Sequence, residues 1–128
     1  MFGRRVWSMI KVIIAGGRDF DDIEGLYEVM DVLYGDIPKV EVVCGMARGA
    51  DELGAHWAGY AGAPVKKFPA DWDKYGKGAG YIRNEHMAQY ADVLVAFWDG
   101  KSKGTKNMIQ KAFDQGLEVH VYRYEAQQ

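Results

Sequence analysis

The stretch MIKVIIAGGRDF, Met9 to Phe20, decides the fold of this chain. Residues 9–15 are almost all apolar and rich in β-branched side chains, and the run stops at Gly16 and Gly17. A short apolar run that ends at glycines is typical of a strand buried on both faces. The sequence therefore predicts a β-strand over residues 9–15, followed by a glycine-rich loop.

Helix and strand patterns alternate along the rest of the chain. After the first strand, apolar residues recur at helical spacing as far as Tyr34, and Asp21 followed by Glu24 resembles a capping box. Further helices are expected over residues 50–61, 81–90 and 105–115, and further strands over residues 40–44, 64–69, 92–98 and 117–122. Five strands alternating with helices predict a Rossmann-like, doubly wound α/β fold, with a mainly parallel sheet covered by helices on both faces.

Length and composition fit a single domain. The 128 residues are 48% hydrophobic, which is enough for one core, and no linker or internal repeat is visible. We expect one domain over residues 9–128, after a short extension at residues 1–8. The net charge of −2 offers no general attraction for nucleic acid or for an anionic membrane, so neither is an expected partner.

Several classes of site and location are disfavoured. No apolar segment approaches the roughly 20 residues that span a bilayer, and no clear signal-peptide cleavage site follows the basic start, so a cytoplasmic protein is expected. The single cysteine, Cys44, lies in the apolar run VEVVC and is interpreted as a small buried side chain. Three scattered histidines give no metal-binding pattern, so no metal site is expected.

Three predicted strand-to-helix loops are rich in glycine and carry a cation: AGGRDFD, CGMARGAD and WDGKSKGT, at residues 15–21, 44–51 and 98–105. Parallel topology brings all three to the same edge of the sheet, where such folds bind ligands. The helix-to-strand connections carry no comparable combination of glycine and cation. This convergence favours a phosphate-bearing ligand, since glycines let backbone N–H groups approach an anion closely.

The loops supply the candidate binding residues. Those predicted to contact the phosphate are Gly16, Gly17, Arg18, Gly100, Ser102, Gly104 and Thr105, and those predicted to form a second wall are Gly45, Arg48, Gly49 and Asp51. Three of them have plain structural alternatives. Thr105 is also expected as the N-cap of its helix, Asp51 caps a helix or binds a ribose hydroxyl, and Arg18 pairs with Asp19 or Asp21.

Residues 68–87, FPADWDKYGKGAGYIRNEHM, are predicted to form a binding loop or lid ahead of a helix. Trp72 and Tyr75 either stack on a base or pack over the core. Arg83 either meets an anion or pairs with Glu85. The chain has neither G-x-G-x-x-G after its first strand nor the P-loop pattern after its fourth, so no nicotinamide or other cofactor is expected.

In these motifs the chain resembles the YspA-like group of the SLOG superfamily. AGGRDF, VVCGMARGADELGAHWA and the run from Phe68 to Thr105 occur in the order and spacing of that group, and the resemblance covers about residues 10–121. It implies a Rossmann-like fold and a nucleotide or ADP-ribose-like ligand. The superfamily includes the LOG-type phosphoribohydrolases and the DNA-processing protein DprA, whose glycine-rich segment is similar to VVCGMARGADELGAH.

The LOG comparison also bears on catalysis. LOG enzymes carry R-K, an apolar strand, and then P-G-G-x-G-T-x-x-E, with the arginine and the glutamate catalytic. Here Arg83-Asn84 stands at R-K, Gly104-Thr105 at G-T, and Met108 at the glutamate. A thioether can neither activate water nor stabilise a ribosyl cation, so a nearby acid such as Glu85 would have to act with Arg83.

The sequence thus supports three functions in descending order. The first is a sensor or binding domain for a nucleotide-type small molecule, held by the loop residues together with Trp72, Arg83 and Asn84. The second is a hydrolase that cleaves the N-glycosidic or phosphate bond of a nucleotide. The third is DprA-like binding of single-stranded DNA, which the aromatic residues and lysines of residues 66–81 favour and the acidic balance disfavours. A homo-oligomer is expected, because the LOG and DprA relatives assemble through their helices.

Overall fold

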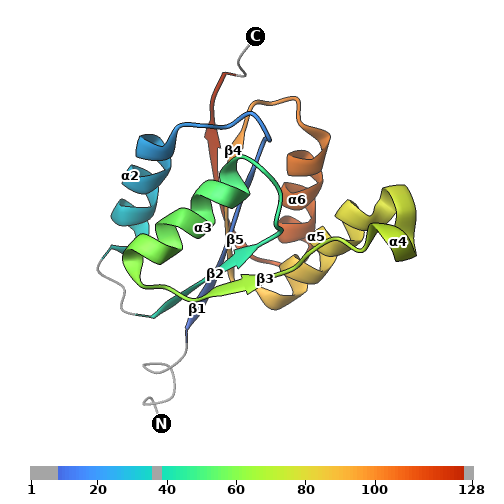
Figure 1. The fold of residues 1–128 in the computed structure, drawn as a ribbon, viewed down its shortest axis with the longest axis horizontal. Helices are drawn as coiled ribbons and strands as arrows, with labels where there is room; N and C mark the ends of the chain where they lie inside the picture. The colour runs from blue at the N-terminus through green and yellow to red at the C-terminus, as the bar shows by residue number, and fades with distance from the viewer. Residues whose placement is uncertain (1–8, 36–38, 126–128) are drawn as a thin grey trace.

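The structure, a computed structural model that describes residues 9–35 and 39–125, contains one five-stranded parallel sheet (Figure 1). The strands lie in the order β3-β2-β1-β4-β5. They are β1 (Ile10–Gly16), β2 (Val40–Cys44), β3 (Val65–Lys67), β4 (Val93–Trp98) and β5 (Glu118–Arg123). The helices are α2 (Ile23–Tyr34), α3 (Ala50–Ala61), α4 (Trp72–Tyr75), the 3-10 turn η1 (Gly76–Gly78), α5 (Ala79–Tyr90) and α6 (Lys103–Asp114).

The central strand β1 accounts for the near-continuous apolar run that opens the domain. Val12 lies opposite Val42 on β2 and opposite Val93 on β4, so β1 is paired along both edges. Helices cover both of its faces, and Val12, Ile13 and Ile14 are fully buried. An apolar side chain is therefore required at successive positions rather than at alternate ones.

Two separate cores confirm the predicted doubly wound fold. Side chains of α2 and α3, including Leu26 and Trp57, pack on one face of the sheet. Side chains of α5 and α6, including Met87 and Met108, pack on the other face. The chain runs outward from β1 to β2 and β3 on one side, then returns to place β4 and β5 on the other. The strand order therefore reverses between β1 and β4, where folds of this kind leave a crevice at the carboxyl ends of the strands.

Several predicted boundaries need correction. The N-cap of α2 is Asp22, which accepts a hydrogen bond from the Gly25 N–H at 2.9 Å, whereas Asp21 stands one residue too early for this bond. The helix α6 begins at Lys103 rather than Thr105, because Ser102 is the residue that caps it. The third strand is shorter than expected, with only Val65–Lys67 paired to β2.

The predicted binding loop at residues 68–87 contains regular structure. The Asp71 side chain accepts the Lys74 N–H at 3.1 Å and thereby caps the short helix α4, and η1 continues into α5. No residue of α4 is buried, and the helix projects from the right-hand side of the molecule in Figure 1. The segment is therefore an exposed folded projection beside the carboxyl edge of the sheet. Within the described ranges, no helix combines the length and apolar content needed to cross a membrane.

Candidate functional site

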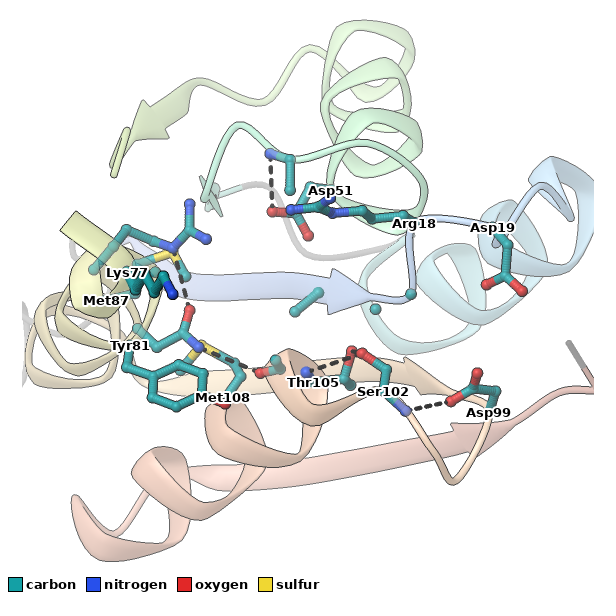
Figure 2. A pocket seen from close by; sticks show the side chains of 18 of the residues that line it. Arg18, Asp19, Asp51, Lys77, Tyr81, Met87, Asp99, Ser102, Thr105 and Met108 are labelled. Atoms are coloured by element: carbon teal, nitrogen blue, oxygen red, sulfur yellow. Dashed lines mark hydrogen bonds between the residues drawn. The ribbon is translucent and has the colours of Figure 1, made fainter. Parts of the chain in front are cut away.

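A cavity of about 510 Å³ opens at the carboxyl ends of β1 and β4, where the strand order reverses (Figure 2). Its walls come from the β1–α2 loop, the β2–α3 loop, the segment from α4 to α5, and the β4–α6 loop with the first turns of α6. All three glycine-rich loops of the sequence therefore meet near one point, although each contributes in a different way.

Glycines hold the first two loops together. A Cβ on Gly16 would lie 2.5 Å from the Phe97 carbonyl oxygen and 2.7 Å from the Ala50 Cβ, so only glycine lets α3 approach β1 this closely. Gly49 has a φ of 76°, and a Cβ there would collide with the Gly17 carbonyl oxygen. Gly49 lines neither this cavity nor an adjoining one, whose walls include Gly45 and Arg48. Loop-to-loop packing therefore explains the glycine at this position.

The β4–α6 loop presents a capped helix start to the cavity. Asp99 Oδ1 accepts the N–H groups of Lys101 and Ser102, both at 2.8 Å, and these bonds lower the pKa of Asp99. Ser102 Oγ accepts the Thr105 N–H at 3.3 Å and lies 3.0 Å from the Thr105 hydroxyl. Gly104 lines the cavity, and its N–H has no acceptor among the described residues. The first turn of α6 therefore offers an unused donor at the positive end of the helix dipole.

A hydrogen-bond network centred on Asn84 fixes Arg83. Asn84, which is buried, donates from Nδ2 to the Gly104 carbonyl at 3.3 Å and to Asn107 Oδ1 at 3.0 Å. Its Oδ1 accepts from Arg83 Nε at 3.2 Å, and Arg83 Nη1 donates to the Gly45 carbonyl. Arg83 thus contacts the β2–α3 loop, and Asn84 holds the guanidinium in place and links it to the start of α6.

Asp51 is a buried carboxyl in the cavity wall, with only 6% of its surface exposed. It lies in the first turn of α3, whose N-cap is Gly49, and its Oδ2 accepts the Ala47 N–H at 3.4 Å. Asp51 therefore braces the preceding loop and does not cap its own helix. Burial raises the pKa of Asp51 to about 6, and the nearby charge of Arg83 limits that rise.

The cations of the cavity are not neutralised by the acids that the sequence suggested. Glu85 pairs with Lys111 at 2.8 Å, and Asp19 Oδ1 accepts the Tyr124 hydroxyl at 2.6 Å. Neither Arg18 nor Arg83 forms an ion pair with a residue in the described part of the chain. Burial lowers the pKa of Arg83, whereas the nearby charge of Asp51 raises it and the weaker influence of Arg18 lowers it. Arg83 therefore lies in the field of the buried Asp51 carboxyl, although the two side chains form no ion pair.

Two exposed aromatic side chains line the cavity. Trp72 is 54% exposed and Tyr81 is 48% exposed, and both line the cavity, whereas Tyr75 does not. In the view of Figure 2, Tyr81 and Lys77 are drawn on the side opposite to Asp19 and Asp99. Trp72 is too exposed to be a core residue, so its ring face is available to a ligand.

The structure brings most of the predicted site together. The predicted residues that line the cavity are Gly16, Gly17, Arg18, Asp51, Trp72, Arg83, Asn84, Ser102, Gly104 and Thr105. Gly45 and Arg48 line an adjoining cavity instead. Glu85 and Gly100 line neither cavity, and a side chain at Gly100, where φ is 84°, would meet the guanidinium of Arg123.

Other lining residues were not proposed as ligand contacts. They include Asp19, Lys77, Tyr81, Met87 and Met108. Lys77 and Tyr81 belong to the segment already singled out by its aromatic residues. Met108 stands at the LOG glutamate position, so the alignment did point to the site, whereas Met87 matches a core pattern and carries no signal of a site. Across the part of the chain that the structure describes, no three His, Cys, Asp or Glu side chains are grouped closely enough to hold a metal ion.

Comparisons with known proteins agree with this architecture. The profile of the family described as "YspA, cpYpsA-related SLOG family" matches residues 10–75. The Gene 61 protein of Mycobacterium phage D29 is 35% identical over 119 residues, which cover 87% of this chain and 94% of that protein. The X-ray structure of DNA processing protein A (DprA) from Streptococcus pneumoniae aligns with a TM-score of 0.72 and 16% identity, over 91% of this chain and 51% of that one. This chain therefore has the fold found in about half of that structure.

Proposed function

The chain belongs to the YspA, cpYpsA-related SLOG family, and from that premise we propose that it is a binding or sensor domain for a nucleotide or nucleotide-derived ligand. The observation that carries this proposal is the position of the 510 Å³ cavity, at the point where the strand order reverses. Open parallel sheets bind their ligands in this crevice.

The chemistry of the walls suits a phosphate next to an aromatic base. The phosphate would lie at the start of α6, where the Gly104 N–H, the Ser102 and Thr105 hydroxyls and the helix dipole favour an anion. Arg18 and Arg83 line the same cavity without ion-pair partners among the described residues, so their positive charges favour an anion there. The base would stack on Trp72 or Tyr81.

One-dimensional proton NMR tests the proposal. The protein is mixed with AMP, GMP, CMP, UMP, NAD and ADP-ribose, and we expect selective broadening of the signals of at least one ligand. Arg18→Gln and Lys77→Gln should each reduce that broadening, because both side chains line the cavity. Lys106→Gln is the matched control, since Lys106 is exposed on α6 and lines no described cavity. If none of the six ligands broadens with the unmodified protein, the proposal fails.

Hydrolysis of the N-glycosidic bond is a second candidate, which Asp51 favours. A buried carboxyl with a pKa of about 6 in a cavity wall is suited to donate or accept a proton near neutral pH. Glu85 is a weaker candidate, because it pairs with Lys111 and does not line the cavity. Met108 occupies the LOG glutamate position as a buried thioether and cannot transfer a proton.

The same NMR samples, followed overnight, test this second candidate. Free base that appears only with protein would establish hydrolysis, and Asp51→Asn should then abolish it. Product formation that survives in Asp51→Asn would remove Asp51 from the reaction. Absence of product from all six ligands would leave binding as the function. Self-association, which the resemblance implies, stays a prediction that analytical ultracentrifugation would test.

A further inference from the structure

A second cavity, of about 370 Å³, adjoins the first. The two cavities share Arg18, Ala47, Trp72 and Arg83, so these four residues form a partition between them. The far side of the second cavity is formed by the β2–α3 loop, including Arg48, and by the residues that precede α4.

The two cavities differ in charge. Acids accompany the cations of the first cavity, in which Asp19, Asp51 and Asp99 line the wall. The second cavity is lined by Arg18, Arg48 and Arg83, and no described acidic residue lines it. Arg48, like Arg18, forms no ion pair with any residue of the described ranges. Three guanidinium groups around one space, without a carboxylate in its walls, favour an anion there.

The wall that carries Arg48 has a defined, strained conformation. Met46 has a φ of 66°, and it is the single non-glycine residue with positive φ within the described part of the chain. Its N–H lies 3.4 Å from Cys44 Sγ, and the neighbouring Gly45 carbonyl accepts a hydrogen bond from Arg83. A non-glycine residue in this region is strained and persists only where its surroundings enforce it. The contacts of the β2–α3 loop therefore hold it in one defined conformation in the wall of the second cavity.

We propose that the second cavity binds a second anionic group of the same ligand, so that the nucleotide carries at least two phosphates. This inference rests on the proposed function, because the first cavity must hold the nucleoside and the first phosphate. Arg18 and Arg83 stand between the two phosphates, and Arg48 contacts only the outer one. A nucleoside monophosphate would fill the first cavity and leave Arg48 without a partner.

Calorimetric titration with AMP, ADP and ATP, and with the three corresponding guanosine nucleotides, tests this assignment. For the base that binds, the diphosphate should bind about tenfold more tightly than the monophosphate. Arg48→Gln should remove about tenfold of the diphosphate affinity and change the monophosphate affinity by less than about twofold. Thr105→Val should weaken mono- and diphosphate alike, and Lys106→Gln should weaken neither.

The outcomes separate this inference from the proposed function. Equal affinities for mono- and diphosphate, or equal losses for both in Arg48→Gln, would overturn the second phosphate site while nucleotide binding stands. No binding of any of these nucleotides, of CMP or UMP, or of NAD or ADP-ribose would overturn the proposed function itself. If a single-stranded oligonucleotide binds more tightly than every mononucleotide, and does so with a steep salt dependence, the arginines contact a nucleic-acid backbone and the inference is wrong.

Discussion

Glycines at the two ends of the sheet differ in what surrounds them. At the carboxyl end, a Cβ on Gly45 would lie 2.8 Å from Arg83 Nη1 and 2.9 Å from Asp51 Oδ2, and Gly16 and Gly49 are crowded in the same way. At the amino end, Gly62 follows α3 and Gly116 follows α6. Both have φ above 70°, and nothing lies within 4 Å of the position that a Cβ would take.

The comparison separates two reasons for a glycine. At Gly62 and Gly116 the backbone conformation alone requires it, because each of these two glycines lets the chain leave a helix in the left-handed region. At Gly16 and Gly45 the neighbouring segments require it, because they pack too closely to admit a side chain, and at Gly49 the backbone conformation and the crowding both do. In this chain, glycines in the loops at the carboxyl end therefore indicate that several loops pack closely together. The space that remains between these loops is the candidate site.

The largest expected effect is at Gly49. Gly49→Ala should destabilise the domain by about 3 kcal/mol or more, because its φ of 76° with ψ of −128° is nearly restricted to glycine and the new Cβ would collide with the Gly17 carbonyl oxygen. Urea unfolding measures this loss. Gly59→Ala, in the same helix, is the matched control, and it should stabilise by up to about 1 kcal/mol because nothing lies near that position. A loss below about 1 kcal/mol for Gly49→Ala would show that the two ends do not differ.

Asp51 makes the carboxyl end sensitive to pH. Its pKa rises from 3.8 in the unfolded chain to about 6 in the fold, so between these values the folded state binds more protons and stability falls as pH rises. The total loss is about 3 kcal/mol, and it is complete above pH 6. Asp51→Asn should lack this dependence, so the variant should gain stability relative to the parent between pH 4 and pH 7. Urea titrations of the parent and of Asp51→Asn at pH 4 and at pH 7 measure the difference in their free energies of unfolding. If that difference is the same at both pH values, the Asp51 carboxylate is not buried.

A smaller effect is expected at Gly62. Gly62→Ala should cost about 1 kcal/mol, because φ of 74° and ψ of 22° place the residue in the left-handed region while no atom obstructs a side chain. Gly62→Asn should cost less, since asparagine tolerates this conformation better. Thermal unfolding of both variants is the measurement. A loss as large as that of Gly49→Ala would mean that crowding does not distinguish the two ends.

The smallest stability change is expected at Gly104, which lies at the carboxyl end but is not crowded. Nothing lies within 4 Å of the position that a Cβ would take, and the residue is in the first turn of α6. Gly104→Ala should therefore keep or raise stability by up to about 0.5 kcal/mol. It should nevertheless weaken nucleotide binding, because the new methyl group would occupy the cavity beside the free N–H. Unchanged affinity in the titration would exclude this donor from the site.

Much of the fold was predictable because its signals are local. Apolar runs and helical periodicity placed all five strands and the four long helices, and parallel topology placed the three loops at one edge. Cap positions were less predictable where two competent residues adjoin, as with Asp21 and Asp22. The short helix α4 was missed because four residues cannot show a helical period.

The site was predictable in position but not in detail. Residue types in the loops indicated which side chains gather, and most of them line the cavity. What they do there depends on contacts between distant segments, such as the pairing of Glu85 with Lys111 and the bracing of Arg83 by Gly45. The burial that raises the pKa of Asp51 likewise arises only in the folded chain. No local pattern encodes such contacts.

The place of β1 at the centre of the sheet has a consequence for how the protein is made. Its partner β2 follows soon after it along the chain, whereas its other partner, β4, is synthesised much later. Until then, one edge of a very apolar strand has no neighbour, and such an edge favours association with other chains. The crevice between β1 and β4 does not exist before that second pairing. A ligand bound there can therefore stabilise the finished domain, but it cannot assist the steps that precede it.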